Sequence, residues 1–193
     1  MLIRTTEPER EPLELEDARR HLRIDSDFED DDGLIGLLIA MARQAAEKET
    51  QRTLITTEYR LVLDCFPCGI IELDKGKVQS IDAIQYRDTS GAWQTLASQY
   101  YASDLSGCPG RVMPAYGTVW PPTYPEIGSV RIDYTAGYGL TSTDVPAGIR
   151  QWMLMLIGSA YANRETVAMV RTGKLEELPF VGGLLDAYRV ELA

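Results

Sequence analysis

The spacing of apolar residues is helical at both ends of the chain and alternating in the middle. Leu15, Ala18 and Leu22 recur three and four residues apart, which predicts a short amphipathic helix over about 13–23. After an acidic break, a longer apolar repeat predicts a second helix to about residue 52, beginning near Asp27, a good N-cap residue type. Its apolar positions are Leu34, Ile35, Leu38, Ile39, Ala42, Ala45 and Ala46.

The middle of the chain, about 53–139, has the period of two that is typical of strands. Strands are predicted near 58–63, 70–73, 78–86, 93–96 and 130–134. The residues from Asp88 to Gly91 have turn chemistry and predict a hairpin between the third and fourth of these strands. Residues 107–125 are rich in Gly, Pro and aromatics, so we expect a loop there, with one short strand near Val112.

Helical spacing returns after Asp144, with Pro146 suited to a first helical turn. This helix is expected to end near 163–165, and a final short helix follows Pro179. The element order predicts an α+β fold that is mainly helical. In it, helices over about 13–52 and 144–192 form one bundle-like domain (13–193), with an antiparallel β insertion over about 53–139. The polar residues 1–12 predict a flexible N-terminal arm.

Composition narrows the classes of function. The net charge of −10 disfavours a protein that reads nucleic acid, because phosphates would be repelled. The longest apolar run, 152–157, is too short to span a bilayer, and the N-terminus lacks the apolar segment of a signal peptide. We therefore expect a protein of the cytoplasm without a membrane partner. Three cysteines, an odd number, argue against a disulfide framework.

The acidic break invites comparison with a calcium-binding loop. Asp25, Asp27 and Glu29 have the spacing of EF-hand ligands. Asp30, however, stands where the loop needs glycine, and Gly36 where it needs a bidentate glutamate. The run is better interpreted as a charged cap on the second helix.

Cys65 and Cys68 form a C-x-x-C sequence. A reactive thiol of this type precedes a helix, whereas the residues after Cys68 predict a strand. A zinc site needs two more ligands, and only Cys108 and His21 remain among the cysteines and histidines. A turn around Pro67 is the favoured interpretation, and a small thiol- or metal-dependent protein centred on the two cysteines stays open as an alternative.

No catalytic constellation is evident. His21 has no Ser or Cys nucleophile motif with it, and Gly137–Gly139 lacks the Lys-Ser/Thr of a phosphate loop. We therefore predict no enzyme activity, no catalytic residue, no cofactor and no metal.

Aromatic residues are concentrated in the loop-rich part of the β region. They could form a local core under long loops or an exposed interface, where Tyr and Trp are enriched. A monomeric module that binds a ligand or peptide through these loops is a further alternative. The residues are Tyr100, Tyr101, Tyr116, Trp120 and Tyr124.

A set of core, turn and charged residues is spread over residues 13–190 in a specific order and spacing. The set is Leu15-x-x-Ala18-x-x-His21-Leu22-Arg23-Ile24-Asp25, Leu34-Ile35-x-x-Leu38-Ile39, Glu49-x-x-x-Arg52, Leu63-Asp64-x-Phe66-Pro67, Ile71-x-Leu73, Val78-x-Ser80-Ile81, Ile84-x-Tyr86-x-Asp88-x-x-Gly91, Tyr101, Trp120-Pro121, Val130-x-Ile132-x-Tyr134-x-Ala136-Gly137-Tyr138, Val145-Pro146-x-x-Ile149, Tyr161-x-Asn163-Arg164-Glu165 and Leu184-Leu185-x-x-Tyr188-Arg189. In this combination the chain resembles the head–tail connector (head-completion adaptor) proteins of long-tailed bacteriophages and prophages.

The resemblance implies a structural virion protein without catalytic residues. Such proteins form a ring, usually of twelve subunits, below the portal protein at the capsid vertex, after assembly in the host cytoplasm. The ring extends the DNA channel and offers a docking surface to a neck or tail-completion protein. The genome would pass through the lumen without sequence-specific binding, which the negative charge would favour. Our candidate interface residues are Tyr116, Trp120, Tyr124 and Arg164, with the 1–12 arm and the 114–125 loop as contact segments.

Overall fold

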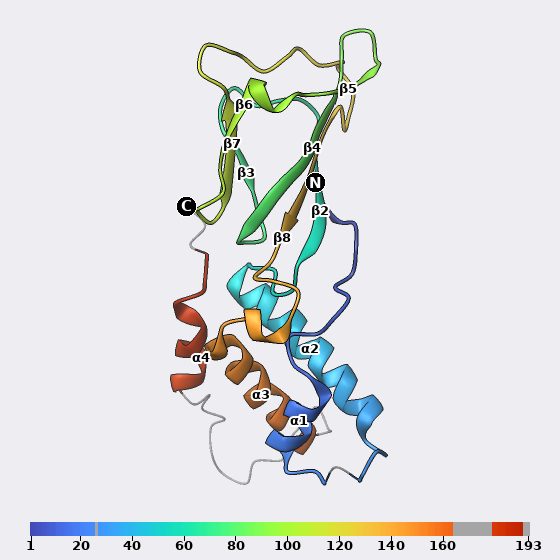
Figure 1. Ribbon diagram of the computed structural model, residues 1–193, viewed down its shortest axis with the longest axis vertical. Coiled ribbons are helices and arrows are strands. Elements are labelled where there is room, and N and C mark those ends of the chain that lie inside the picture. The colour runs from blue at the N-terminus through green and yellow to red at the C-terminus, as the bar shows by residue number, and fades with distance from the viewer. Residues whose placement is uncertain (26, 164–178, 191–193) are drawn as a thin grey trace. The chain divides into compact units, whose positions relative to one another are not determined.

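The computed structural model describes residues 1–25, 27–163 and 179–190, and for residues 179–182 only the backbone. The chain divides into two compact units (Figure 1). The β unit consists of Met1–Pro8 and Thr56–Tyr138, and the helical unit of Glu9–Ile55 and Gly139–Ala193.

The predicted α+β class is confirmed, but "mainly helical" is too strong. The described residues hold about as much strand as helix, because the loop-rich middle contains several strands of only three to five residues. Such short strands give little periodic signal. In the described part of the chain, no helix is both long and apolar enough to cross a membrane.

The helical unit contains α1 (Leu15–Leu22), α2 (Asp32–Thr50), the 3-10 turn η2 (Ser142–Asp144), α3 (Ala147–Ala162) and α4 (Pro179–Asp186). Its core is aliphatic, and the helical spacing expected for α2 and α3 is confirmed by the burial of the predicted positions. The fully or nearly fully buried residues include Ala18, Ile35, Ile39, Ala42, Ala46, Ile149, Met153, Ile157 and Leu185.

The predicted start of α2 near Asp27 is wrong, because the helix begins at Asp32. Arg19 of α1 is the physical reason. Its Nη2 donates to the Phe28 carbonyl at 3.1 Å and its Nε to Asp32 Oδ1 at 2.8 Å. The chain before Asp32 therefore lies around a nearly buried guanidinium instead of continuing the helix.

The β unit contains two antiparallel sheets. The larger has the order β1-β2-β8-β4-β5 and the smaller β3-β7-β6. The predicted strands and the strand near Val112 are confirmed. Their bounds are β1 Leu2–Arg4, β2 Thr57–Leu63, β3 Ile71–Leu73, β4 Val78–Arg87, β5 Trp93–Thr95, β6 Tyr101–Asp104, β7 Gly110–Pro114 and β8 Val130–Ala136, with the 3-10 turn η1 at Ser98–Tyr100.

The predicted hairpin joins β4 to β5, with Gln85 opposite Thr95. Asp88 closes its turn, since Oδ1 accepts the backbone N–H groups of Ser90 and Ala92 at 2.9 and 3.1 Å. These bonds, together with bonds from the Ser90 hydroxyl and the Gln94 amide, lower the Asp88 pKa to about 2. Favouring the charged carboxylate in this way is the expected effect of donors placed around it.

The first residues of the expected N-terminal arm form a strand at the edge of the larger sheet. Leu2 lies opposite Leu61, and the Val62 N–H donates to the Met1 carbonyl at 2.8 Å. Leu2 packs against the core, which explains the pairing of so short a segment.

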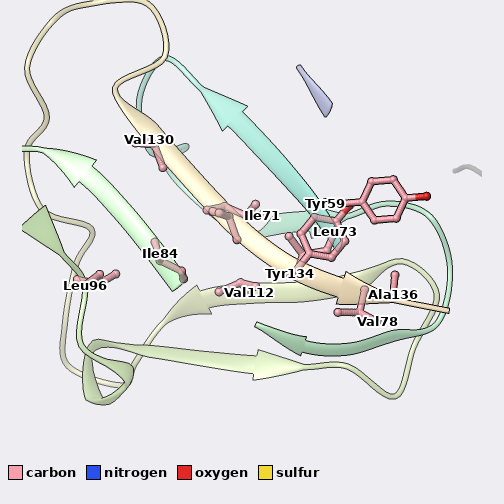
Figure 2. Packing of buried hydrophobic residues seen from close by; sticks show 11 residues of the cluster. Tyr59, Ile71, Leu73, Val78, Ile84, Leu96, Val112, Val130, Tyr134 and Ala136 are labelled. Carbon is pink, nitrogen blue, oxygen red and sulfur yellow. The ribbon is translucent and has the colours of Figure 1, made fainter. Parts of the chain in front are cut away.

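The core of the β unit lies between the two sheets, as Figure 2 shows. Ile71 and Val112 from the smaller sheet pack in one cluster with Ile84 and Tyr134 from the larger. The Tyr134 ring stacks on Tyr59 at 5.7 Å, and its hydroxyl donates to the Asp74 carbonyl at 2.9 Å. Burial raises the pKa of Tyr134, so this hydroxyl remains a donor at neutral pH.

Candidate assembly surface

A tight turn at 115–118 follows β7 and is fixed by its own hydrogen bonds. The Ala115 N–H donates to the Tyr100 carbonyl at 3.0 Å, and the Thr118 N–H to the Ala115 carbonyl at 2.9 Å. Gly117 has φ +77°, a left-handed conformation that glycine adopts without steric cost. The turn is therefore a defined platform for the residue at its tip, Tyr116.

Tyr116 is fully exposed. Three more large apolar side chains are exposed at positions that flank this turn in the chain or are hydrogen-bonded to it. Val119 is 84% exposed, while Met113 of β7 and Tyr100 of η1 are each about half exposed. Exposed apolar side chains that gather in one region commonly mark a surface for a partner protein. This region, which we call the Tyr116 surface, is defined by Tyr100, Met113, Tyr116 and Val119.

The side chain of Trp120, another predicted interface residue, makes contacts within the subunit. Its ring stacks on Phe66 at 4.7 Å with an interplanar angle of 6°, and its Nε1 donates to the Gly69 carbonyl at 3.1 Å. Phe66 also lies 5.8 Å from the Tyr86 ring. Trp120 thus belongs to a local core under the loop, whereas Tyr116 does not. An interface at Tyr116 stays a prediction.

Tyr124 is exposed, though less than Tyr116, with 40% of the residue accessible. Its backbone N–H donates to the Arg87 carbonyl at 3.0 Å, which holds the loop along β4. Arg87 also pairs with Glu126 at 2.5 Å. The fourth predicted interface residue, Arg164, lies outside the described residues.

Charged side chains on the larger sheet form contacts that sequence reasoning missed. Arg60 and Asp133 lie opposite each other on β2 and β8 and form a two-bond pair at 2.6 and 3.0 Å, which raises the Arg60 pKa. The Arg131 guanidinium lies 4.1 Å from the centre of the Trp93 ring. In the sequence, such pairs are indicated only by opposite charges in alternating segments. The register between neighbouring strands decides which of these charges lie opposite each other.

The sequence-derived alternatives for chemistry gain no support in geometry. Cys65 and Cys68 are free and exposed between β2 and β3, and Cys108 is half-buried. Within the described ranges, no three His, Cys, Asp or Glu side chains could hold a metal ion together. The His21 ring lies against α3, where Nε2 would be 3.3 Å from a Cβ placed on Gly158.

The end of the acidic break has a structural role beyond capping. Asp31 accepts a hydrogen bond from the Tyr161 hydroxyl of α3, and Asp32 binds Arg19 of α1. The break thus fastens α2 to both neighbouring helices.

Two distant segments of the resemblance meet in the helical unit. Arg52, just after α2, donates from Nε to the Tyr188 carbonyl at 2.6 Å. Arg189 pairs with Glu49 of α2 at 3.3 Å. These contacts give a physical reason for the joint occurrence of the two motifs.

Comparison with known proteins gives one family match and several similar solved structures. Residues 12–94 match the family described as "Phage gp6-like head-tail connector protein". No curated protein matches it significantly. Three similar solved chains come from structures titled "Neck of empty GTA particle computed with C6 symmetry", "Virion of native gene transfer agent (GTA) particle" and "Neck of native GTA particle computed with C12 symmetry".

These three chains share the fold. Their TM-scores are 0.81, 0.80 and 0.77 at 23%, 24% and 22% identity, and each alignment covers 100% of this chain and 97% of the other. The family match agrees with the residue pattern of the resemblance, which also extends beyond residue 94. Residues 12–94 thus match the phage gp6-like head-tail connector family, and the chain as a whole shares the fold of the three GTA chains.

Proposed function

We propose that this connector assembles with identical copies into a ring, twelve in the virion, below the portal protein. There it extends the DNA channel and receives a neck or tail-completion protein. The observation that carries the proposal is the match of residues 12–94 to the connector family. The fold likeness to chains from GTA particle necks, computed with C6 and C12 symmetry, is consistent with this stoichiometry.

The ring closes by a head-to-tail contact in which each copy presents one surface to a different surface of the next. Such a contact closes if its rotation divides a full turn. The β unit and the helical unit act together as the connector domain of one subunit. The net charge of −10 keeps the lumen from retaining DNA as it passes.

The Tyr116 surface is the proposed docking site for a neighbouring protein of the neck. Tyr116 supplies a rigid, amphipathic anchor of the kind enriched among interface hot spots. Trp120 contributes indirectly by fixing the loop on Phe66, while Tyr124 and Arg164 extend the interface. The support is the exposure of Tyr116 on a turn whose backbone is fully defined.

Complementation of a gene deletion tests the proposal. Particles lacking the gene should accumulate as DNA-filled heads without tails, and the wild-type gene should restore joining. Tyr116→Asp should fail to restore it, because a charge at the centre of an apolar contact is costly. Thr89→Asp, which adds the same charge at the exposed tip of the β4–β5 turn, is the matched control. Tailed particles from the deletion strain would contradict the proposal.

A further inference from the structure

A groove between α1 and α3 has the features of an anion site in an otherwise acidic protein. It encloses about 370 Å³. Basic and apolar side chains dominate its walls, with one carboxylate among them. The lining residues are Leu13, Asp17, Arg20, His21, Ala147, Arg150, Gln151 and Leu154.

Arg150 is the distinctive residue of this α1–α3 groove. Its Nε is buried and has no hydrogen-bond acceptor among the described residues. Leaving a buried donor of a charged group unpaired is costly, so native proteins almost always provide an acceptor. Within the described part of the chain this donor therefore has no acceptor, and an anion bound in the groove would supply one.

Two further features favour an anion in the same place. Ala147 and Arg150 belong to the first turn of α3, which starts after Pro146 without a side-chain cap. The N-terminus of a helix carries partial positive charge and free N–H groups. Arg20 adds a guanidinium whose pairs with Asp17 and Glu16, at 3.7 and 3.8 Å, are longer than charge-assisted hydrogen bonds.

We propose that the α1–α3 groove binds carboxylates from the acidic segment between α1 and α2 of a second copy of this chain. That segment presents Asp25, Glu29 and Asp30 to solvent. Groove and segment are complementary in charge and have no residue in common, as the two surfaces of a head-to-tail contact require. The inference rests on the proposed ring, whose subunit contact it specifies.

A carboxylate partner is favoured over DNA phosphate by the charge of the whole chain. At −10, the surface around the groove repels a polyanion such as DNA. A short acidic segment held by an adjacent subunit faces less repulsion because the ring already places it there.

Charge exchange in the full-length chain tests the contact. Self-association is measured by sedimentation, and incorporation into particle necks by quantitative mass spectrometry. Arg150→Glu and the double variant Glu29→Arg/Asp30→Arg should each weaken assembly about tenfold or more, since each places like charges together. The chain carrying all three substitutions should recover most of the wild-type level. Lys48→Glu, an exposed charge reversal on α2 outside the groove, should have no effect.

Folding is checked by circular dichroism. If Arg150→Glu does not fold, Arg150→Gln and Arg20→Glu replace it, and each should reduce assembly. Assembly of the groove variants at the wild-type level would overturn the inference while leaving the ring intact. The inference would also be overturned if the triple variant assembled no better than Arg150→Glu or the double variant. Duplex DNA binding that Arg150→Gln abolishes would overturn it as well. A wild-type chain missing from the neck would instead overturn the proposed function.

Discussion

The β unit and the helical unit use charge and apolar surface in opposite ways. The β unit buries an apolar core between two sheets and keeps its ion pairs, such as Arg60 with Asp133, partly exposed. The helical unit buries arginines: Arg19 and Arg43 are only 8% and 5% exposed and bind Asp32, Glu11 and Glu47. These pairs fasten the non-helical segments before α1 and before α2.

The contrast shows which surfaces are available for assembly. In the β unit, Tyr116 is fully exposed and does not belong to the core cluster, so its side chain is available to a partner. In the helical unit, Arg19 and Arg43 have carboxylate partners, while Arg150 has a buried Nε without an acceptor among the residues that the structure describes. We place an intermolecular contact at each of these two groups: the apolar Tyr116 side chain in the β unit and the charged Arg150 side chain in the helical unit.

Removing an apolar residue from the β core should give the largest effect. Ile132 is fully buried on β8 between the sheets. Ile132→Ala should lower the free energy of unfolding by about 3–4 kcal/mol, from lost burial and the cavity that remains. Urea unfolding followed by near-ultraviolet circular dichroism measures it, with the exposed Thr95→Ala on β5 as the control. A change below about 1 kcal/mol would contradict the two-sheet core.

Breaking the buried ion pairs of the helical unit should come next. Arg43→Ala removes the ion-pair partner of Glu11 and Glu47. It should cost about 2–3 kcal/mol, since Glu11 regains some hydration and Glu47 keeps the hydrogen bond from the Leu54 N–H. Unfolding of the helical signal at 222 nm measures it. Arg20→Ala is the matched control: Arg20 also faces two carboxylates but is 71% exposed, so the cost should stay below about 1 kcal/mol. Equal costs would refute the contrast between buried and exposed pairs.

Acid should act locally on the β4–β5 hairpin. The Asp88 pKa is lowered to about 2 from its ordinary value of 3.8, so its stabilising bonds are fully present above that ordinary value. They are lost as the pH falls from about 4 towards 2. The protection of the Ser90 and Ala92 amides, measured as exchange relative to the intrinsic rate at each pH, should fall over this range. Asp88→Asn should remove this pH dependence of the protection, while Thr89→Ala keeps it. A pH-independent protection in the wild type would count against these bonds.

The smallest expected effect on stability is at Tyr116. Tyr116→Ser should change the free energy of unfolding by less than about 0.5 kcal/mol, because the side chain is fully exposed. Trp120→Ala, by contrast, removes the stack on Phe66 and should cost at least about 1 kcal/mol. A comparison of the two unfolding curves decides whether the aromatic residues divide as described; a clear loss of stability in Tyr116→Ser would show that they do not.

Much of the fold could be predicted because periodicity records burial directly. The apolar spacing of α2 and α3 and the turn chemistry of Asp88–Gly91 are local properties, and each placed its element correctly. The start of α2 could not be predicted, since it depends on Arg19 reaching Phe28 and Asp32 from another helix. Strand β1 has three residues and is a strand only because it pairs with β2.

The candidate surface was predictable in composition but not in detail. The sequence marks a loop rich in aromatics, and enrichment of Tyr and Trp suggests an interface. It does not tell that Trp120 stacks on Phe66 while Tyr116 projects from a glycine turn, because this depends on contacts across more than 50 residues. Arg150 gave no sequence signal at all, since an unpaired buried donor is defined only by its surroundings.

The most direct test of the account is cryo-electron microscopy of the neck of particles that carry this connector. We predict a symmetric ring at the head–tail junction, with density for this fold in every subunit and the Tyr116 surface of each β unit covered by a neighbouring protein. A neck without this fold, or a ring in which Tyr116 faces solvent in every copy, would contradict the account.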